Sequence, residues 1–434
     1  MPRSARTLAA VVVSLSLFLT ACTEGSATTT SPDQTPTTGP GTSTTIPGAT
    51  TTSTLPDLSD LDVPEAVREQ LEGLIVLAQE IRGLPFLSRP KITVVDAAGL
   101  RARVEAMLEE SFEDLPADES LYKLLGLLPG DADLEAMLVE LYGEQVAGFY
   151  DGETGEIVVP ARETGFSLLQ QGTLVHELVH ALTDQHFGFD DVRRDMIDSE
   201  RYDEASSLLA LVEGDATFSE LRWVQTLSQR EIGQYIAESL GADSGALDRV
   251  PQFIIESLLF PYEFGLIFVQ SLHSRGGWDA VNQAYLEMPD LPGSTEQIIT
   301  PADFGRDLPI PVEPIPVIVA GYELITTSVW GELGFRLMFN QVLGENDSFR
   351  AADGWGGDFY HQWFDGSDAA LLLVYTGDTA DDIEELRTAL LDYRRRAVPT
   401  EAFVWVAVRG DQLFFIAADD PEVGAFLRTE MGLD

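Results

Sequence analysis

The sequence is poor in cysteine, in histidine and in basic residues, and these shortages exclude several classes of protein. Cys22 is the only cysteine among 434 residues, so neither an internal disulfide nor a thiolate metal site can form. Lys and Arg number 26 against 72 Asp and Glu, giving a formal net charge of −46. Because phosphate backbones are bound by positive charge, this balance argues against nucleic acid as a partner.

The composition is that of a folded protein with more than one domain. Hydrophobic residues make up 44% of the chain and aromatic residues 9%, which is enough apolar surface for a core. Single cores usually stop growing at about 250–300 residues, and this chain is longer. A Pro-rich stretch over 301–316 marks a boundary. We therefore expect one folded part over 59–300 and a smaller one over 301–434.

The N-terminus has the pattern of an export signal. Arg3 and Arg6 precede an apolar stretch over 8–19 that is too short to be a good membrane span. The stretch ends in Leu-Thr-Ala-Cys at 19–22, which resembles the bacterial lipobox, where the cysteine is lipidated and begins the mature chain. We expect residues 1–21 to be a lipoprotein signal peptide, and the mature protein to be extracytoplasmic and attached to the cell membrane through lipidated Cys22.

The segment over 22–58 is predicted to be a tether between the lipid and the folded domains. It consists mainly of Thr, Ser, Pro and Gly and has almost no residues to bury, so it cannot offset the entropy of ordering. A flexible chain of this length spans roughly 30–35 Å on average, enough to hold a domain clear of a membrane surface.

Local patterns predict an α+β fold that is mainly helical. A Gly-containing turn between two apolar runs predicts a β-hairpin over 148–159, and a long helix follows it at about 167–186. The smaller part after residue 301 is predicted to be α+β. The other predicted helices cover 67–81, 104–112, 121–128, 134–142, 203–230, 250–285, 322–342 and 381–396, and the other strands 92–95, 370–375, 403–408 and 413–417.

Three of the five histidines lie within residues 176–186, and two of them, His176 and His180, belong to a His-Glu-Leu-Val-His motif. On a helix His176 and His180 are one turn apart and about 40° from alignment, so both imidazoles can reach one ion. Glu177 projects about 100° away, where it can reach a water held by the metal and act as a general base. The motif predicts a catalytic Zn²⁺ site.

A catalytic zinc needs a third protein ligand, and two residues compete for that position. Glu213 lies in an otherwise apolar segment, where a buried carboxylate must be neutralised, and Gly214 beside it indicates close approach of another element. His186 has the spacing of the metzincin pattern, but that pattern needs a glycine where this chain has Thr183. We assign Glu213 as the ligand and keep His186 as the alternative.

The supporting residues around the metal stay open at this point. Asp184 and Asp215 are both candidates to accept the outer N–H of a ligating histidine. Tyr150, Tyr262 and His273 are the candidates to stabilise an oxyanion, and the sequence does not choose among them.

A His-Glu-x-x-His motif followed by a glutamate on a later helix resembles the gluzincin clan of zinc peptidases. The segments Gln145–Asp151, His176–Phe187, Glu213–Ala216 and Ser294–Ile298 also resemble a group of bacterial exported lipoproteins. The resemblance covers residues 134–301. It implies a zincin-like metallopeptidase domain, with zinc held by His176, His180 and Glu213 and with Glu177 as the base. It also implies that the hairpin before the helix is an edge strand that binds peptide.

The expected function is therefore hydrolysis of peptide bonds in a peptide or protein substrate, outside the cytoplasmic membrane. One alternative is a lipid-anchored binding or scaffold protein in which the zinc site is structural or vestigial. Another is a zinc amidase that acts on a non-peptide substrate with the same residues. Glu177 favours catalysis, because a scaffold needs ligands but no base. The sequence gives no indication of the oligomeric state.

Overall fold

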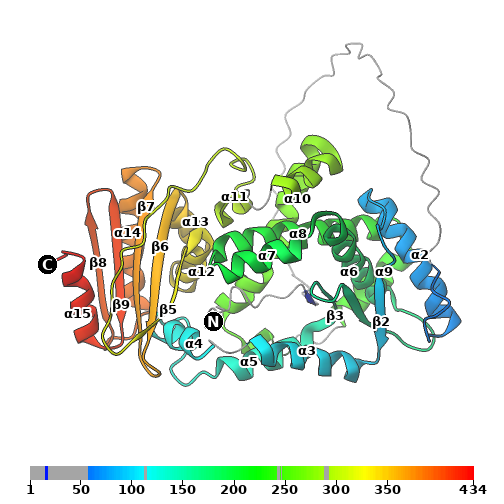
Figure 1. Cartoon of the computed structure of the whole chain (residues 1–434), viewed down its shortest axis with the longest axis horizontal. Helices are drawn as coiled ribbons and strands as arrows, with labels where there is room; N and C mark the ends of the chain where they lie inside the picture. The colour runs from blue at the N-terminus through cyan, green and yellow to red at the C-terminus, as the bar shows by residue number, and fades with distance from the viewer. Residues whose placement is uncertain (1–14, 18–56, 112–114, 242–244, 246, 288–292) are drawn as a thin grey trace, which may run out of the picture.

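The computed structural model describes residues 15–17, 57–111, 115–241, 245, 247–287 and 293–434. The predicted signal peptide, apart from 15–17, lies outside these residues, as do Cys22 and nearly all of the predicted tether. The described chain is α+β and mainly helical, which confirms the predicted fold class. A helical part with a small sheet leads into a second part built on a five-stranded sheet, drawn in yellow to red in Figure 1.

The helical part contains a four-stranded sheet of order β1-β3-β4-β2. Its hairpin is formed by β3 (Val146–Asp151) and β4 (Glu156–Pro160), which pair antiparallel as predicted. On one side β2 (Lys91–Val95) runs parallel to β4, and on the other β1 (Leu15–Leu17) pairs antiparallel with β3. Strand β1 lies inside the predicted signal peptide. Cleavage of that peptide would therefore remove β1 and leave the edge of β3 without a partner strand.

Helix α6 (Leu168–Phe187) follows the hairpin directly and carries the His-Glu-Leu-Val-His motif. A capping box begins it, in which Ser167 accepts from the backbone of Gln170 and the Gln170 side chain accepts from the Ser167 N–H. Gly188, with φ of 62°, ends it in the left-handed conformation that favours glycine. The sequence thus fixes both ends of this helix locally.

Helices surround α6, and the predicted long helix over 203–230 is divided in two. Ser228 caps the start of α9, so α8 ends at Val224 and α9 begins at Gln229. The helices of this part are α2 (Glu65–Arg82), α3 (Ala97–Ser111), α4 (Leu115–Leu124), α5 (Leu134–Gln145), α7 (Phe189–Asp198), α8 (Tyr202–Val224), α9 (Gln229–Leu240), α10 (Gln252–Glu287) and α11 (Thr295–Ile299), with a 3₁₀ turn at Leu247–Arg249.

Two glycines let α8 and α10 cross at backbone contact. A Cβ on Gly214 of α8 would lie 2.1 Å from the carbonyl oxygen of Gly265, and a Cβ on Gly265 would lie 2.0 Å from that of Ala210. No real side chain tolerates these distances, so the crossing requires glycine on both helices. The close approach that Gly214 predicted is confirmed, and it sets the position of Glu213 beside it.

Helix α10 is long and apolar enough to cross a membrane by length and composition. In this structure it packs along α8, and Phe268, Val269 and Leu272 belong to the same buried cluster as α6. Gly276 and Gly277 have non-helical backbone angles and kink it near its end. Of its apolar 18-residue stretch, 44% is buried inside the protein.

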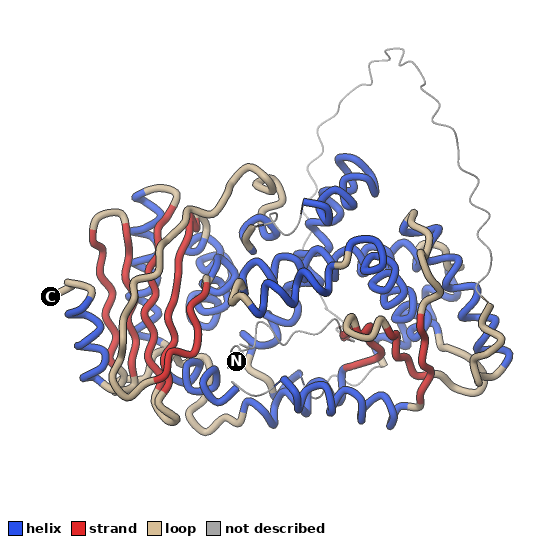
Figure 2. Tube along the Cα trace, in the orientation of Figure 1, coloured by secondary structure: helices blue, strands red, loops and turns tan. Residues whose placement is uncertain are grey.

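The second part is an antiparallel sheet of order β5-β6-β7-β9-β8, with helices packed against it (Figure 2). Its strands are β5 (Glu323–Ser328), β6 (Trp355–Phe364), β7 (Ala369–Gly377), β8 (Phe403–Arg409) and β9 (Gln412–Ala418). Its helices are α12 (Gly331–Leu343), α13 (Glu345–Ala352), α14 (Ala380–Arg396) and α15 (Pro421–Glu430).

Two sequence predictions in this part were wrong or incomplete. The predicted helix over 322–342 is a strand, β5, followed by α12, because Gly331 with φ of 74° turns the chain between them. Strand β6 was missed because nine of its ten residues are buried, polar ones included, so the apolar–polar alternation of a half-buried strand is absent. Buried Asp358 accepts from two backbone N–H groups and from Trp355 Nε1.

The helix crossing gives a first prediction. Gly214→Ala forces α8 and α10 apart, and we expect it to lower the free energy of unfolding by about 2–4 kcal/mol in urea titrations. Gly233→Ala is the matched control, because Gly233 lies on exposed α9 with no atom within 4 Å of an added Cβ. It should stabilise the protein by about 0.5–1 kcal/mol through helix propensity. Equal effects of the two substitutions would contradict the proposed role of the crossing.

Candidate metal centre

The structure brings His176, His180 and Glu213 together, although Glu213 lies on a different helix from the two histidines. Oε2 of Glu213 is 3.0 Å from Nε2 of His176 and 3.3 Å from Nε2 of His180. The two imidazole rings are 4.6 Å apart between centroids and nearly perpendicular. One ligand atom from each of the three residues, a ring nitrogen or a carboxylate oxygen, lies within 4.8 Å of the other two.

All three side chains are buried, with exposed fractions of 3% for His176 and 0% for His180 and Glu213. Burial alone would lower the pKa of His176, but its hydrogen bonds to Glu213 and Glu220 outweigh burial and raise it to about 10. Burial alone would raise the pKa of Glu213, but the two imidazoles lower it to about 2. The carboxylate therefore stays ionised, and positive charge beside it is strongly favoured.

The geometry and chemistry of these atoms fit a zinc ion. In a tetrahedral site with bonds of about 2.0–2.1 Å, ligand atoms lie about 3.3–3.4 Å apart. The observed separations of 3.0 and 3.3 Å are close to that span. Two neutral imidazoles and one carboxylate are also a common donor set for catalytic zinc. Nδ1 of His180 and Oε1 of Glu213 are buried without a hydrogen-bond partner among the described residues.

Glu177 follows the first histidine and is fully buried. Its charge contributes to the raised pKa values of His176 and Tyr262, which places its carboxylate near both groups. The helical periodicity that aligns the two histidines directs Glu177 to a neighbouring face of α6. The residue is thus beside the centre without being one of the three grouped side chains.

The sequence analysis missed Glu220, a second carboxylate of α8 that faces His176. Its Oε2 lies 3.5 Å from Nδ1 of His176, and its Oε1 accepts a hydrogen bond of 2.8 Å from the Tyr235 hydroxyl of α9. Metal-bound histidines commonly donate their outer N–H to a carboxylate, which fixes the tautomer of the ring. Glu220 is seven residues after Glu213, on the same face of the helix, and this spacing was the available signal.

The two aspartates considered for this orienting role have other partners. Asp215 is buried against Arg82, whose Nε lies 2.8 Å from its Oδ2 with both side chains fully buried. Asp184 accepts hydrogen bonds from the Tyr150 hydroxyl and from the backbone N–H of Asp190. The contact with the outer nitrogen of His176, for which Asp184 and Asp215 were candidates, is made by Glu220.

His186, the alternative third ligand, lies away from the centre. Helix α6 continues through Thr183 without a turn, which carries His186 to another face of the helix. There its Nε2 is 2.7 Å from the Pro85 carbonyl oxygen. The grouped ligand set contains Glu213 in its place.

Of the three candidates for stabilising an oxyanion, Tyr262 contacts the candidate centre. Its ring stacks on His176, with centroids 6.1 Å apart. Burial, then the charges of Glu213 and Glu177, raise its pKa well above the usual value, so the phenol keeps its proton. His273 instead packs against Phe218 and Trp278, and Tyr150 donates to Asp184.

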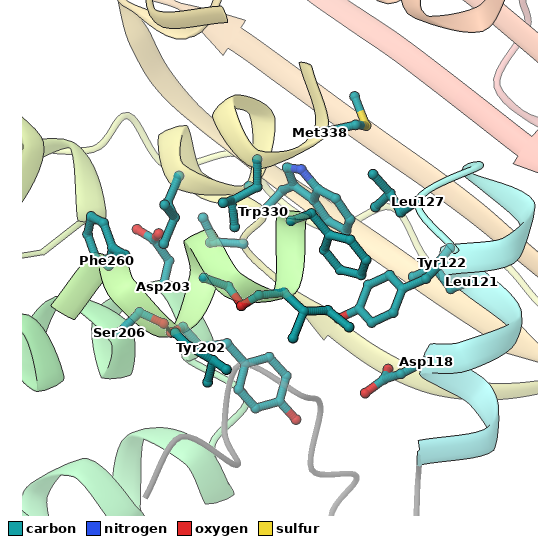
Figure 3. Close-up of a pocket in the computed structure, with 18 of the residues that line it drawn as sticks. Asp118, Leu121, Tyr122, Leu127, Tyr202, Asp203, Ser206, Phe260, Trp330 and Met338 are labelled. Carbon is teal, nitrogen blue, oxygen red and sulfur yellow. Dashed lines mark hydrogen bonds between the residues drawn. The ribbon is translucent and has the colours of Figure 1, made fainter. Parts of the chain in front are cut away.

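An apolar cavity of about 140 Å³ lies between the helical part and the second part (Figure 3). Its lining from the helical part includes Tyr202, Ser206 and Phe260. The second part contributes Met338 of α12 and Trp330, the residue just before α12. His176, His180 and Glu213 are not among its lining residues. The cavity is part of the junction between the two parts.

Comparison with known proteins bears on the second part of the chain. A family model for a domain of unknown function (DUF8575) matches residues 321–427. The match begins two residues before β5 and ends within α15. The match covers the five-stranded sheet and nearly all of its helices, and it does not include His176, His180 or Glu213. No curated protein and no solved structure matches the chain.

The ligand assignment can be tested by metal content. We expect the purified wild-type protein to hold about one zinc per chain, and Glu213→Gln to lose most of it, because the remaining two imidazoles leave the dication without a charged partner. Inductively coupled plasma mass spectrometry after gel filtration measures this. His186→Ala is the control and should keep its zinc. Loss of zinc from the control, with retention in Glu213→Gln, would reverse the assignment.

The contact of Glu220 with His176 gives a separate prediction. Glu220→Gln should weaken zinc binding by about 10- to 100-fold, because the ring loses the carboxylate that orients it. Competition with a chromophoric chelator measures the affinity. Tyr235→Phe removes the hydroxyl that donates to Oε1 of Glu220. It should also weaken zinc binding, but by less. Unchanged affinity in both variants would show that the 3.5 Å contact has no orienting role.

Proposed function

We propose that the protein is a zinc-dependent peptidase that acts outside the cytoplasmic membrane, to which lipidated Cys22 attaches it. The observation that carries the proposal is the position of Glu213, whose carboxylate lies within 3.0 and 3.3 Å of the two imidazoles of a His-Glu-x-x-His helix. Together with Glu177 on the same helix, this arrangement has the parts of a gluzincin centre in a zincin-like domain.

The reaction proposed is hydrolysis of an amide bond by water. Zinc held by His176, His180 and Glu213 would supply a Lewis acid for the scissile carbonyl and for the attacking water. Glu177 accepts the proton that the water gives up and then donates it to the leaving amine. Tyr262, which keeps its proton, is positioned beside His176 as a hydrogen-bond donor for the oxygen that becomes negative.

The hairpin before α6 supports a peptide or protein as the substrate. In the described sheet one edge of β3 is paired only with 15–17, which the predicted signal cleavage removes. An open strand edge binds an extended chain through backbone hydrogen bonds. Thr173 of α6 would lie 3.2 Å from a Cβ on Gly148 of β3, so this strand packs directly on the helix of the motif.

One observation favours the second hypothesis, a lipid-anchored binding protein with a structural zinc. The three grouped side chains and Glu177 are at most 3% exposed, so the centre is closed in this conformation. A closed site suits a structural ion, whereas a peptidase must admit substrate and keep one coordination position open. An amidase acting on a non-peptide substrate uses the same residues and is tested by the same variants.

Catalysis is tested with Glu177→Gln, which removes the base but none of the proposed ligands. We expect wild-type protein to cleave members of a mixed peptide library, and the variant to cleave them about 10²- to 10⁴-fold more slowly while keeping its zinc. Mass spectrometry of the products measures the rates. Glu385→Gln, at an exposed position of α14, is the control and should cleave as wild type does. One zinc per chain with no cleavage by any of these proteins would support the binding hypothesis.

A further inference from the structure

The segment Ser294–Ile298, which the proposed catalytic centre does not use, is buried where the two parts of the chain meet. Thr295 donates its backbone N–H and its hydroxyl to Asp203 of α8, at 2.9 and 2.6 Å. Thr295 Oγ1 also accepts from the backbone N–H of Leu333 on α12. These bonds fix α11 between a helix of the first part and a helix of the second.

Glu296 of this segment is a buried carboxylate that lacks a partner. It is 6% exposed, and within the described ranges no N–H or O–H group donates to its oxygens and no cationic side chain pairs with it. Burying a carboxylate without compensation costs roughly several kcal/mol, so a proton or a cation would stabilise this group. The nearby Arg336 is already paired with Glu332, at 3.0 Å.

Two further carboxylates converge on Glu296 from different segments. One oxygen each of Glu296, Asp307 and Asp378 lie within 4.8 Å of one another. Asp307 is in the loop after α11, where Gln297 holds the loop by donating to the Asp307 carbonyl and accepting from the Gly305 N–H. Asp378 directly follows β7, so the second part of the chain supplies the third carboxylate.

We propose that Glu296, Asp307 and Asp378 bind a calcium ion that joins the two parts of the chain. Ca²⁺ takes oxygen ligands at about 2.3–2.6 Å, so two oxygens bound to one ion lie at most about 4.6–5.2 Å apart, and three oxygens that lie within 4.8 Å of one another can share one ion. An all-oxygen set suits Ca²⁺ better than zinc, and three carboxylates from separate segments suit its flexible geometry better than the strict octahedron of Mg²⁺.

The surrounding charge supports a cation at this position. Burial, followed by the charge of Glu332, raises the pKa of Glu296 to about 9, and Asp307 and Asp378 add to the effect. Among the described residues near the group the charges are mostly acidic, and the ion pair of Arg336 with Glu332 leaves the three carboxylates uncompensated. The competing explanation is a proton held by Glu296, and it predicts no response to calcium.

The test is the calcium dependence of thermal unfolding, measured on the zinc-loaded mature protein at physiological ionic strength. Extracellular calcium sites have dissociation constants of about 10⁻⁴–10⁻³ M, so about 10 mM CaCl₂ should raise the Tm by roughly 2–4 °C. The same concentration of MgCl₂ should raise it much less. Glu296→Gln and Asp378→Asn should abolish the calcium response, and Asp378 is exposed, so its variant should fold normally.

Glu313→Gln is the matched control, an exposed acid in the loop that follows Asp307, and should respond to calcium as wild type does. The proposal is overturned if calcium leaves the wild-type Tm unchanged, as a protonated Glu296 requires. It is also overturned if Glu296→Gln and Asp378→Asn respond like the control, or if magnesium acts as strongly as calcium. Because the readout is stability, the outcome does not depend on whether the protein has peptidase activity.

Discussion

The arrangement of the centre depends on one contact, the crossing of α8 over α10 at Gly214 and Gly265. Backbone contact at this point leaves no room for side chains and fixes the rotation of α8 about its own axis. That rotation directs Glu213 towards α6, where its ionised carboxylate meets two buried imidazoles. A carboxylate at this depth is stable only beside positive charge, so the packing and the electrostatics of the centre require each other.

The buried centre creates a balance between stability and access. In the absence of an ion, a proton on His176 and the charge on Glu213 stabilise each other, as the pKa values of about 10 and about 2 indicate. A bound dication would replace that proton and use the same carboxylate. Hydrolysis would further require the centre to open, and α10 borders it through Tyr262, which stacks on His176.

The second part of the chain lies outside the candidate metal centre. Its sheet matches a domain family of unknown function, and it meets the helical part through the apolar cavity and through α11. The bonds of Thr295 to Asp203 hold that junction on one side. The three carboxylates around Glu296 lie at the same junction, so ion binding there and the relative position of the two parts are physically coupled.

The sequence by itself determined the features that depend on neighbouring residues. The helical repeat placed His176 and His180 on one face of α6, and the mainly helical α+β class followed from the same periodicities. These patterns did not predict strand β6, because the strand is buried on both faces. They also did not predict that β5 ends and α12 begins at Gly331, because the positive φ of this one residue turns the chain. Only the tertiary structure decided that Glu220 faces His176 and that three carboxylates from separate segments converge. Contacts between elements depend on how whole helices and sheets pack, and no local repeat encodes that packing.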